Sequence, residues 1–276
     1  MRVFVTGATG YIGSEVVREL IGAGHKVIGL TRSDKGALKL KQAGAEVHQG
    51  SLDDLDSLRS GAAIADGVIH LAFKHDFSDF AGSLSTDLQA IQAIGEVLEG
   101  TGKPFLTTAH ANSTASDNAT LALAKRGVRA SVVSLSPSVH GDGDKGFVPL
   151  LINIARAKGF SAYIGDGLNR WSAVHRLDAA RLFRLALEAA PAGSKLDGVG
   201  DEGIPFRDIA NVIGGHLNLP VVSITREEAT AHFGFLGTIA ALDIQRSSVH
   251  TQELLGWRLV HPTLIADLEQ GHYFEK

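Results

Sequence analysis

The sequence predicts an α/β protein built on a doubly wound parallel sheet. Short apolar runs alternate with helical patterns through the first half of the 276-residue chain, which is typical of βαβ units. A glycine-rich turn joins the first apolar run to the first helical pattern. Hydrophobic residues make up 44% and charged residues 20% of the chain, as in ordinary globular domains. Right-handed crossovers then place helices on both faces of one sheet.

The elements follow from apolar patterning and from the residues that interrupt it. Glycines at positions 22 and 24, for example, end the first helical pattern. We expect strands over Arg2–Val5, Lys26–Leu30, Glu46–His48, Gly67–Ala72, Phe105–Thr108 and Ala130–Leu135. We expect helices over Ile12–Ile21, Leu38–Ala43, Leu52–Ser60, Thr86–Leu98, Ala119–Lys125, Val148–Lys158 and Asp178–Ala190, and a further helix that opens over Phe206–Ile213.

Composition excludes several function classes. The net charge is only -4 and no basic run is present, which argues against nucleic-acid binding. The chain has no cysteine, so disulfides and thiolate catalysis are excluded, and its 12 histidines show no metal-binding spacing. Glycines follow Met1–Val5 at once, unlike a signal peptide, and no run reaches the roughly 20 apolar residues of a membrane helix. We expect a cytoplasmic protein without metal or membrane partner, a monomer or homodimer that takes a small-molecule substrate.

The turn after the first strand predicts a dinucleotide site. It reads Thr6-Gly-Ala-Thr-Gly-Tyr-Ile-Gly13 and opens a helix. Gly7 permits a tight turn, Gly10 lets the backbone approach a pyrophosphate, and Gly13 allows the helix to pack closely on the strand. The helix N-terminus supplies N–H groups for the phosphates, so we expect Thr9, Tyr11 and Ile12 to line the site as well. Without the strand and helix around them, these glycines would indicate only a turn.

The end of the second strand bears on which dinucleotide is bound. A site for NAD usually carries an acidic residue there, which bonds the ribose hydroxyls. This chain has Arg32 followed by Ser33 instead. A guanidinium can bind a 2′-phosphate and stack on adenine. We therefore expect NADP(H) to be preferred, with NAD(H) possible; the alternative is that Arg32 is a solvated loop charge.

Together with the turn, three further segments give the chain its resemblance to a known family. They are Gly50–Asp53, Val68–Phe73 and Gly165–Asp178. With these motifs the chain resembles the extended or atypical short-chain dehydrogenases/reductases, the superfamily of NAD-dependent epimerases and dehydratases. The resemblance implies a Rossmann fold and covers almost the whole chain.

The family also implies roles for particular segments of this chain. Ser51 and Leu52 would flank the adenine, and Leu71, Ala72 and Phe73 would line the ribose and nicotinamide side. Pro137 lies in a segment that resembles the one covering the nicotinamide. The resemblance further implies a dinucleotide-binding domain over 1–147, to which 165–200 return, and a substrate-binding lobe over 148–164 and 201–276.

The family's catalytic residues are missing. Members of the family normally use a Tyr and a Lys four positions later on one helix, where the lysine lowers the pKa of the phenol. The tyrosines here are Tyr11, Tyr163 and Tyr273, and none has a lysine at that spacing. The stretch 109–129 between the fifth and sixth strands, where the family places a longer loop and the helix that carries the dyad, is also short. Either this lineage lost residues there, or a loop is missing from the sequence.

Two residues near that stretch are candidate replacements. Thr108 ends the fifth strand, near the family's substrate-orienting hydroxyl, and can bond a carbonyl; alternatively it caps the strand. His110 can act as general acid if its pKa is near neutral, or it is a solvated loop histidine. Three functions remain open: an NAD(P)-dependent oxidoreductase that transfers hydride to or from a small carbonyl or imine; a catalytically inactive NADP-binding sensor or regulator; and an NAD-dependent sugar epimerase or dehydratase.

Overall fold

A computed structural model of the protein describes residues 1–76, 78–110 and 113–275. The chain forms two compact units. Unit 1 comprises Met1–Ser134, Ala179–Leu196 and His250–Trp257, and unit 2 comprises Leu135–Asp178, Asp197–Val249 and Arg258–Lys276. Residues 135–147, 165–178 and 197–200 therefore group with unit 2, whereas the division implied by the sequence placed them with the dinucleotide-binding domain. Residues 250–257 group with unit 1 and not with the implied substrate-binding lobe. Within the described ranges, no helix is both long enough and apolar enough to cross a membrane.

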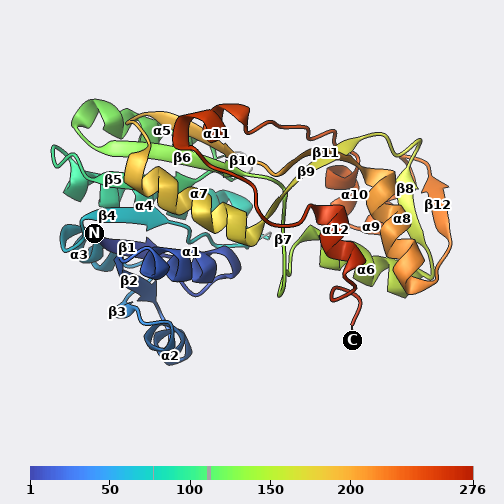
Figure 1. The fold of residues 1–276 in the computed structure, drawn as a ribbon, viewed down its shortest axis with the longest axis horizontal. Helices are drawn as coiled ribbons and strands as arrows, with labels where there is room; N and C mark the ends of the chain where they lie inside the picture. The colour runs from blue at the N-terminus through green and yellow to red at the C-terminus, as the bar shows by residue number, and fades with distance from the viewer. Residues whose placement is uncertain (77, 111–112, 276) are drawn as a thin grey trace. The chain divides into compact units, whose positions relative to one another are not determined.

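A seven-stranded sheet with the order β10-β6-β5-β4-β1-β2-β3 forms the centre of unit 1 (Figure 1). Strands β1 to β6 pair in parallel throughout. The strand order reverses between β1 and β4, and ligands of such sheets bind beyond the carboxyl ends of the strands at that point. The predicted fold class is confirmed. The strands are β1 (Arg2–Thr6), β2 (Lys26–Thr31), β3 (Glu46–Gln49), β4 (Gly67–His70), β5 (Pro104–Thr108), β6 (Arg129–Leu135) and β10 (Ser194–Gly198).

Helices cover both faces of this sheet. Arg184 Nε of α7 lies 2.7 Å from Glu19 Oε1 of α1, so these two helices run side by side on one face (Figure 1). Helices α3, α4 and α5 pack in sequence on the other face, over a core that includes Phe4, Ile91 and Phe105. The helices are α1 (Tyr11–Gly22), α2 (Asp34–Gln42), α3 (Leu55–Ala63), α4 (Phe80–Leu98), α5 (Thr114–Ala122), followed by the 3-10 turn η1 (Leu123–Arg126), and α7 (Arg176–Ala189).

Several element boundaries differ from those predicted, for a shared physical reason. Helix α2 begins four residues earlier than the apolar pattern suggested because the Ser33 hydroxyl accepts the Gly36 N–H. Asp54 caps α3, so that helix begins at Leu55 and not at Leu52. Asp79 caps α4 and extends it back to Phe80. Capping side chains set these ends because they satisfy N–H groups that have no acceptor within the helix.

Two further boundaries were wrong at the carboxyl edge of the sheet. Strand β4 ends at His70 and not at Ala72, so Leu71 and Ala72 lie in the segment that leaves the sheet. Helix α5 begins at Thr114, five residues before the predicted start at Ala119, and ends at Ala122. Ala111 and Asn112, within the shortened stretch, lie outside the described residues.

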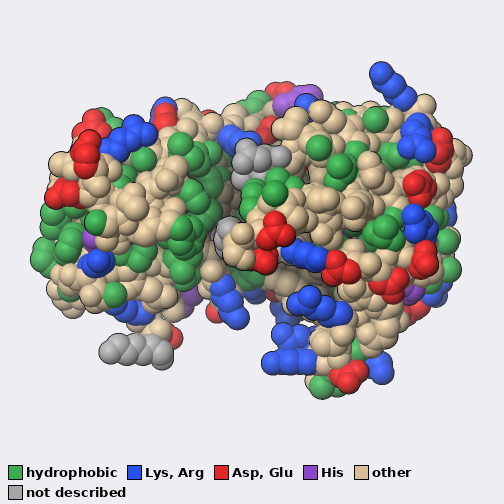
Figure 2. Space-filling view, turned by 180° about the vertical axis from the view of Figure 1, so that it is seen from behind, with side chains coloured by type: hydrophobic (Ala, Val, Ile, Leu, Met, Phe, Trp, Pro, Cys, Tyr) green, Lys and Arg blue, Asp and Glu red, His purple; other side chains and the backbone are tan. Residues whose placement is uncertain are grey.

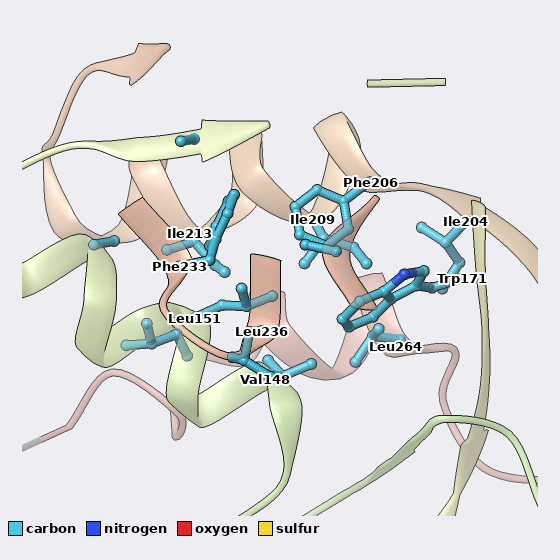
Figure 3. Close-up of a cluster of buried hydrophobic side chains, with 14 of the residues drawn as sticks. Val148, Leu151, Trp171, Ile204, Phe206, Ile209, Ile213, Phe233, Leu236 and Leu264 are labelled. Atoms are coloured by element: carbon cyan, nitrogen blue, oxygen red, sulfur yellow. The ribbon is translucent and has the colours of Figure 1, made fainter. Parts of the chain in front are cut away.

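Unit 2 has its own core around Trp171. The indole packs edge-on against Phe206, with ring centroids 5.0 Å apart, and both side chains are buried (Figure 3). One sheet has the order β11-β9-β7 and a second pairs β12 with β8. The elements are β7 (Ser138–His140), α6 (Phe147–Lys158), β8 (Ser161–Ile164), β9 (Arg170–His175), β11 (Asp201–Pro205), α8 (Phe206–Leu217), β12 (Val221–Ile224), α9 (Ala229–Phe233), α10 (Leu236–Ala240), α11 (Val249–Leu255), most of which belongs to unit 1, and α12 (Leu264–Glu269).

Candidate dinucleotide-binding site

The turn between β1 and α1 requires glycine at two positions for steric reasons. Gly7 has φ +67, and a Cβ there would lie 2.7 Å from the backbone nitrogen of Ala72. A Cβ on Gly13 would lie 2.0 Å from the carbonyl oxygen of Gly7. At Gly10 the added carbon would meet only that same oxygen, at 3.1 Å. The fold therefore needs Gly7 and Gly13, whereas Gly10 leaves room above the turn.

The N-terminus of α1 is suited to an anion. Gly10 is its N-cap residue, so no side chain caps the helix, and the first turn carries no acidic residue. The opening N–H groups of a helix have no acceptor within the helix. Together with the helix dipole they attract phosphate. The predicted residues Thr9, Tyr11 and Ile12 all lie at this end of α1 and are half-buried.

The two residues predicted to select the cofactor differ in availability. Arg32 is exposed, and no described residue forms an ion pair or hydrogen bond with its guanidinium. Ser33 is engaged, because its hydroxyl oxygen accepts the Gly36 N–H at 3.2 Å as the cap of α2. Of these two residues, only Arg32 therefore has a polar side chain that is not already bonded to another described residue.

Other cations lie close to Arg32. Figure 2 shows several Lys and Arg side chains gathered at the lower right, where α2 lies. Between α1 and α2 is an open hollow of about 360 Å³, which Thr9 of the turn borders together with Arg18 and Lys39. Arg18 also pairs with Glu15, with Nη1 and Oε1 2.7 Å apart. This side of unit 1 presents positive charge next to the phosphate-binding turn.

The predicted adenine loop lies between β3 and α3. Ser51 and Leu52 occupy the turn that precedes α3, and the Ser51 hydroxyl accepts the Asp53 N–H at 3.3 Å. Lys74, which follows β4, pairs with Asp53 through Nζ and Oδ1, 2.5 Å apart. The predicted adenine loop is thereby connected to the segment that carries Phe73. The Lys74 ammonium is occupied by this ion pair.

An aromatic cluster lies beyond the carboxyl ends of β4 and β5. Phe73 stacks on His110, with ring centroids 4.0 Å apart and planes at 27°. His75 and Phe80 contact the same phenyl ring edge-on, at 5.3 and 5.9 Å. Burial lowers the pKa of His110 to about 4, although the nearby Asp87 charge opposes this shift. The expectation of a near-neutral pKa for His110 was wrong, because its ring is buried in this stack.

Thr108 lies at the end of β5, as predicted. Its hydroxyl donates to the carbonyl oxygen of His70 at 3.4 Å and so links the ends of β4 and β5. This bond supports a role in ending the strand, and it leaves the lone pairs of the oxygen available. Thr108 and His110, the two candidate replacements, both belong to unit 1. Pro137 is half-buried and belongs to unit 2.

Helix α5 follows β5, where the family places its Tyr-Lys helix. It contains neither tyrosine nor lysine, and its sequence is TASDNATLA. Ser116 and Thr120 face the core. Asp117 accepts a hydrogen bond from Ser113 at 2.9 Å, and burial raises its pKa. The position therefore provides no phenol to exchange a proton with a substrate.

Acidification should destabilise the protein through His110. Its pKa is about 4 in the folded chain and 6.5 in the reference state, so the unfolded chain takes up a proton first as the pH falls. The contribution of His110 to stability is fully present above about pH 6.5 and is lost towards pH 4. We expect a loss of about 2 kcal/mol, reduced from the full linkage value because the ring is partly exposed. Urea unfolding at pH 7.5 and pH 4.5 measures the loss, and His110→Gln should reduce it by that amount, while His175, whose pKa burial also lowers to about 4, keeps its own share. An equal loss in the variant and the parent would assign the loss to other groups.

These features define unit 1 as a dinucleotide-binding domain of the Rossmann type. The NmrA-like family matches residues 1–97, which span the turn, β2 and the β4 end. An uncharacterized protein of Schizosaccharomyces pombe is 50% identical over 295 residues, which cover 99% of this chain and 100% of the relative. A second, from Saccharomyces cerevisiae, is 45% identical over 298 residues, with 99% of each chain covered. The chain belongs to the family of these two fungal proteins.

More distant matches agree with this assignment. A 2-alkyl-3-oxoalkanoate reductase of Stenotrophomonas maltophilia is 28% identical, with 84% of this chain and 80% of the relative covered. A dTDP-glucose 4,6-dehydratase from Streptomyces venezuelae, solved with NAD, superimposes with a TM-score of 0.78 at 18% identity, over 99% of this chain and 97% of that one. The predicted resemblance to the extended or atypical short-chain dehydrogenases/reductases is confirmed.

Proposed function

We propose that this protein is an NADP(H)-dependent oxidoreductase that transfers hydride to or from a carbonyl or imine carbon of a small substrate. The observation that carries the proposal is the glycine turn, which opens the uncapped N-terminus of α1 beside the β1–β4 reversal of the sheet. The similar reductase from Stenotrophomonas maltophilia supports reduction of an oxo group. Nicotinamide supplies the hydride, and the chain's own residues bind and orient the reactants.

The cofactor preference rests on Arg32. Its unpaired guanidinium follows β2, where an acidic side chain would otherwise bond the ribose hydroxyls of NAD. Lys39 adds positive charge beside the same turn, whereas the charge of Arg18 is balanced by Glu15. A 2′-phosphate there would meet a cation that no described carboxylate neutralises, whereas NADH would gain nothing from it.

Arg32→Ala should weaken NADPH binding and leave NADH binding almost unchanged. A charge-assisted hydrogen bond is worth about 1.5–3 kcal/mol, which corresponds to a roughly 10- to 150-fold rise in Kd. Titration calorimetry with both dinucleotides measures the difference. Lys41→Ala is the matched control, since it also removes a single cation but lies in the last turn of α2, away from the end of β2. Equal weakening in both variants, or tighter binding of NADH than of NADPH by the parent, would refute the assignment.

Proton handling must differ from that of a Tyr-Lys enzyme. A neutral His110 can donate an N–H hydrogen bond to a substrate oxygen without being an acid at neutral pH, a role that imidazole can fill in enzymes. Thr108 can add a second contact to that oxygen if its hydroxyl turns from the His70 carbonyl. The pair would orient and polarise the carbonyl, and water would supply the proton.

A sensor or regulator that binds NADP without catalysis is the second candidate. The lack of a tyrosine or lysine in α5 favours it, and so does the bond that engages the Thr108 hydroxyl. A panel of ketones, aldehydes and imines with NADPH separates the two functions. Loss of absorbance at the nicotinamide band supports the oxidoreductase, and tight binding without turnover supports the sensor.

A further inference from the structure

Three polar side chains form a continuous line inside the core of unit 1. Thr6 ends β1, His70 ends β4, and Asp87 lies in the middle of α4. Their exposed fractions are 0%, 2% and 1%. Thr6 Oγ1 lies 2.8 Å from His70 Nδ1, and His70 Nε2 lies 3.3 Å from Asp87 Oδ1. Groups of this kind are costly to bury unless each of them is hydrogen-bonded.

The direction of every hydrogen bond in this line can be deduced. Thr6 Oγ1 accepts the backbone N–H groups of Leu71 and Ala72, each at 3.2 Å. A hydroxyl has two lone pairs and one proton, so its proton must go to His70 Nδ1. That nitrogen then carries no hydrogen, and the proton of the neutral ring lies on Nε2. His70 therefore donates to Asp87, and the relay runs from the peptide groups through Thr6 and His70 to the carboxylate.

The carboxylate stays ionised despite its burial. Burial acts to raise the pKa of Asp87, but hydrogen bonds from His70 and Ser116 outweigh it and the pKa is lowered. The negative charge draws the Nε2 proton and makes Nδ1 a stronger acceptor. A stronger acceptor in turn polarises the Thr6 hydroxyl, since hydrogen bonds in a chain reinforce one another.

The relay ends where the glycine turn contacts the segment that follows β4. The peptide between Leu71 and Ala72 lies against Gly7, so closely that a Cβ on Gly7 would be 2.8 Å from the Leu71 carbonyl carbon and 2.7 Å from the Ala72 nitrogen. Thr6 precedes Gly7 in the chain. Fixing the N–H groups of residues 71 and 72 to Thr6 thus fixes the β4 end against the turn.

We propose that Asp87, His70 and Thr6 are positioning residues for the dinucleotide, and that they act by holding the Leu71–Ala72 backbone against the glycine turn. The inference rests on the proposed function, because it presupposes that this turn binds NADP(H). None of the three side chains needs to touch the cofactor. Their effect passes through the backbone of the residues that line it.

Thr6→Val tests the proposal, because valine matches threonine in shape and removes only the hydroxyl. We expect the Kd for NADPH to rise about tenfold or more, the usual size of an effect from groups that support a binding residue. Thr6→Ser restores the hydroxyl and should restore the affinity. The matched control is Thr120→Val, which removes another buried hydroxyl. The Thr120 hydroxyl lies 3.1 Å from that of Thr107 and does not contact the glycine turn. This control should lower the Tm similarly and leave the Kd unchanged.

The charge of the relay is tested separately. Asp87→Asn keeps an oxygen that accepts the His70 proton and removes the negative charge, so we expect a smaller rise in Kd than in Thr6→Val. Nitrogen-15 NMR of His70 should show a protonated Nε2 and a bare Nδ1 in the parent protein, without any ligand. A protonated Nδ1, or a Thr6→Val variant that binds NADPH like the parent, overturns the relay. A parent that binds neither dinucleotide overturns the proposed function itself, and the NMR result still reports on the relay.

Discussion

Gly10→Val should abolish dinucleotide binding while the protein stays folded. Gly10 has φ -76 and ψ 177, a conformation that valine adopts readily. The added side chain would occupy the space above the turn, where the pyrophosphate must approach the N–H groups of α1. Losing even two charge-assisted hydrogen bonds of about 1.5–3 kcal/mol each weakens binding by at least about a hundredfold. Calorimetry with NADPH and circular dichroism of the variant measure the two effects.

Two other glycines serve as controls for this result. Gly22 lies at the end of α1, and a Cβ added there would have nothing within 4 Å. Gly22→Ala should therefore fold and bind NADPH like the parent protein. Gly13→Ala should instead damage the fold itself, because its Cβ would clash with Gly7 O and overpacking costs at least about 1–3 kcal/mol. If Gly10→Val binds NADPH with the affinity of the parent, the pyrophosphate does not sit on this turn.

His110→Ala should lower kcat by about a hundredfold or more once a substrate is known, which is the usual size of the effect of removing one hydrogen-bond donor to a developing oxyanion. The reason is loss of the N–H donor that polarises the substrate carbonyl. Two variants separate the donor from the stacked ring. His110→Phe keeps a ring on Phe73 without an N–H, and His110→Gln keeps an N–H without the ring. The first should be as slow as alanine, and the second should recover part of the rate.

The pH profile gives the same role a second test. Because burial lowers the pKa of His110 to about 4, the ring is neutral through the ordinary working range. The rate should therefore be flat between about pH 5.5 and pH 8 with respect to this group, and should change only on acidification towards pH 4. A rate that falls through the usual histidine range of about 6.5 would contradict a neutral donor. Parental turnover by His110→Ala would remove the role altogether.

Local sequence patterns predicted most of unit 1 correctly. The apolar runs that became β1, β2 and β5 are short, continuous and bounded by turn residues, so their type could hardly be mistaken. Helix starts were harder, because the caps Ser33, Asp54 and Asp79 set them, and apolar spacing does not reveal a cap. In unit 2 the paired segments β8 and β12 are far apart in the chain, and nothing local in either predicts its partner.

The candidate site was predicted where it depends on local geometry. The glycine turn needs only the residues between β1 and α1, and they identified it. The pKa of His110 depends on burial among Phe73 and its neighbours, which come from other segments. Asp87 was missed although a signal existed: Ser83, Ala90, Ile94 and Leu98 mark the buried stripe of α4, and Asp87 lies on that stripe. A carboxylate at a core position indicates a buried partner, which is here His70.

The makeup of unit 1 also has a consequence for its biosynthesis. Strand β10 at the sheet edge begins at Ser194, and the segment His250–Trp257 completes the unit with an indole that is 0% exposed. A ribosome makes the glycine turn, which ends at Gly13, first and His250–Trp257 last. The nascent domain therefore stays incomplete until these segments are made, and its uncovered sheet edge is prone to non-native pairing. Chaperone engagement during translation should thus persist until nearly the whole chain has emerged.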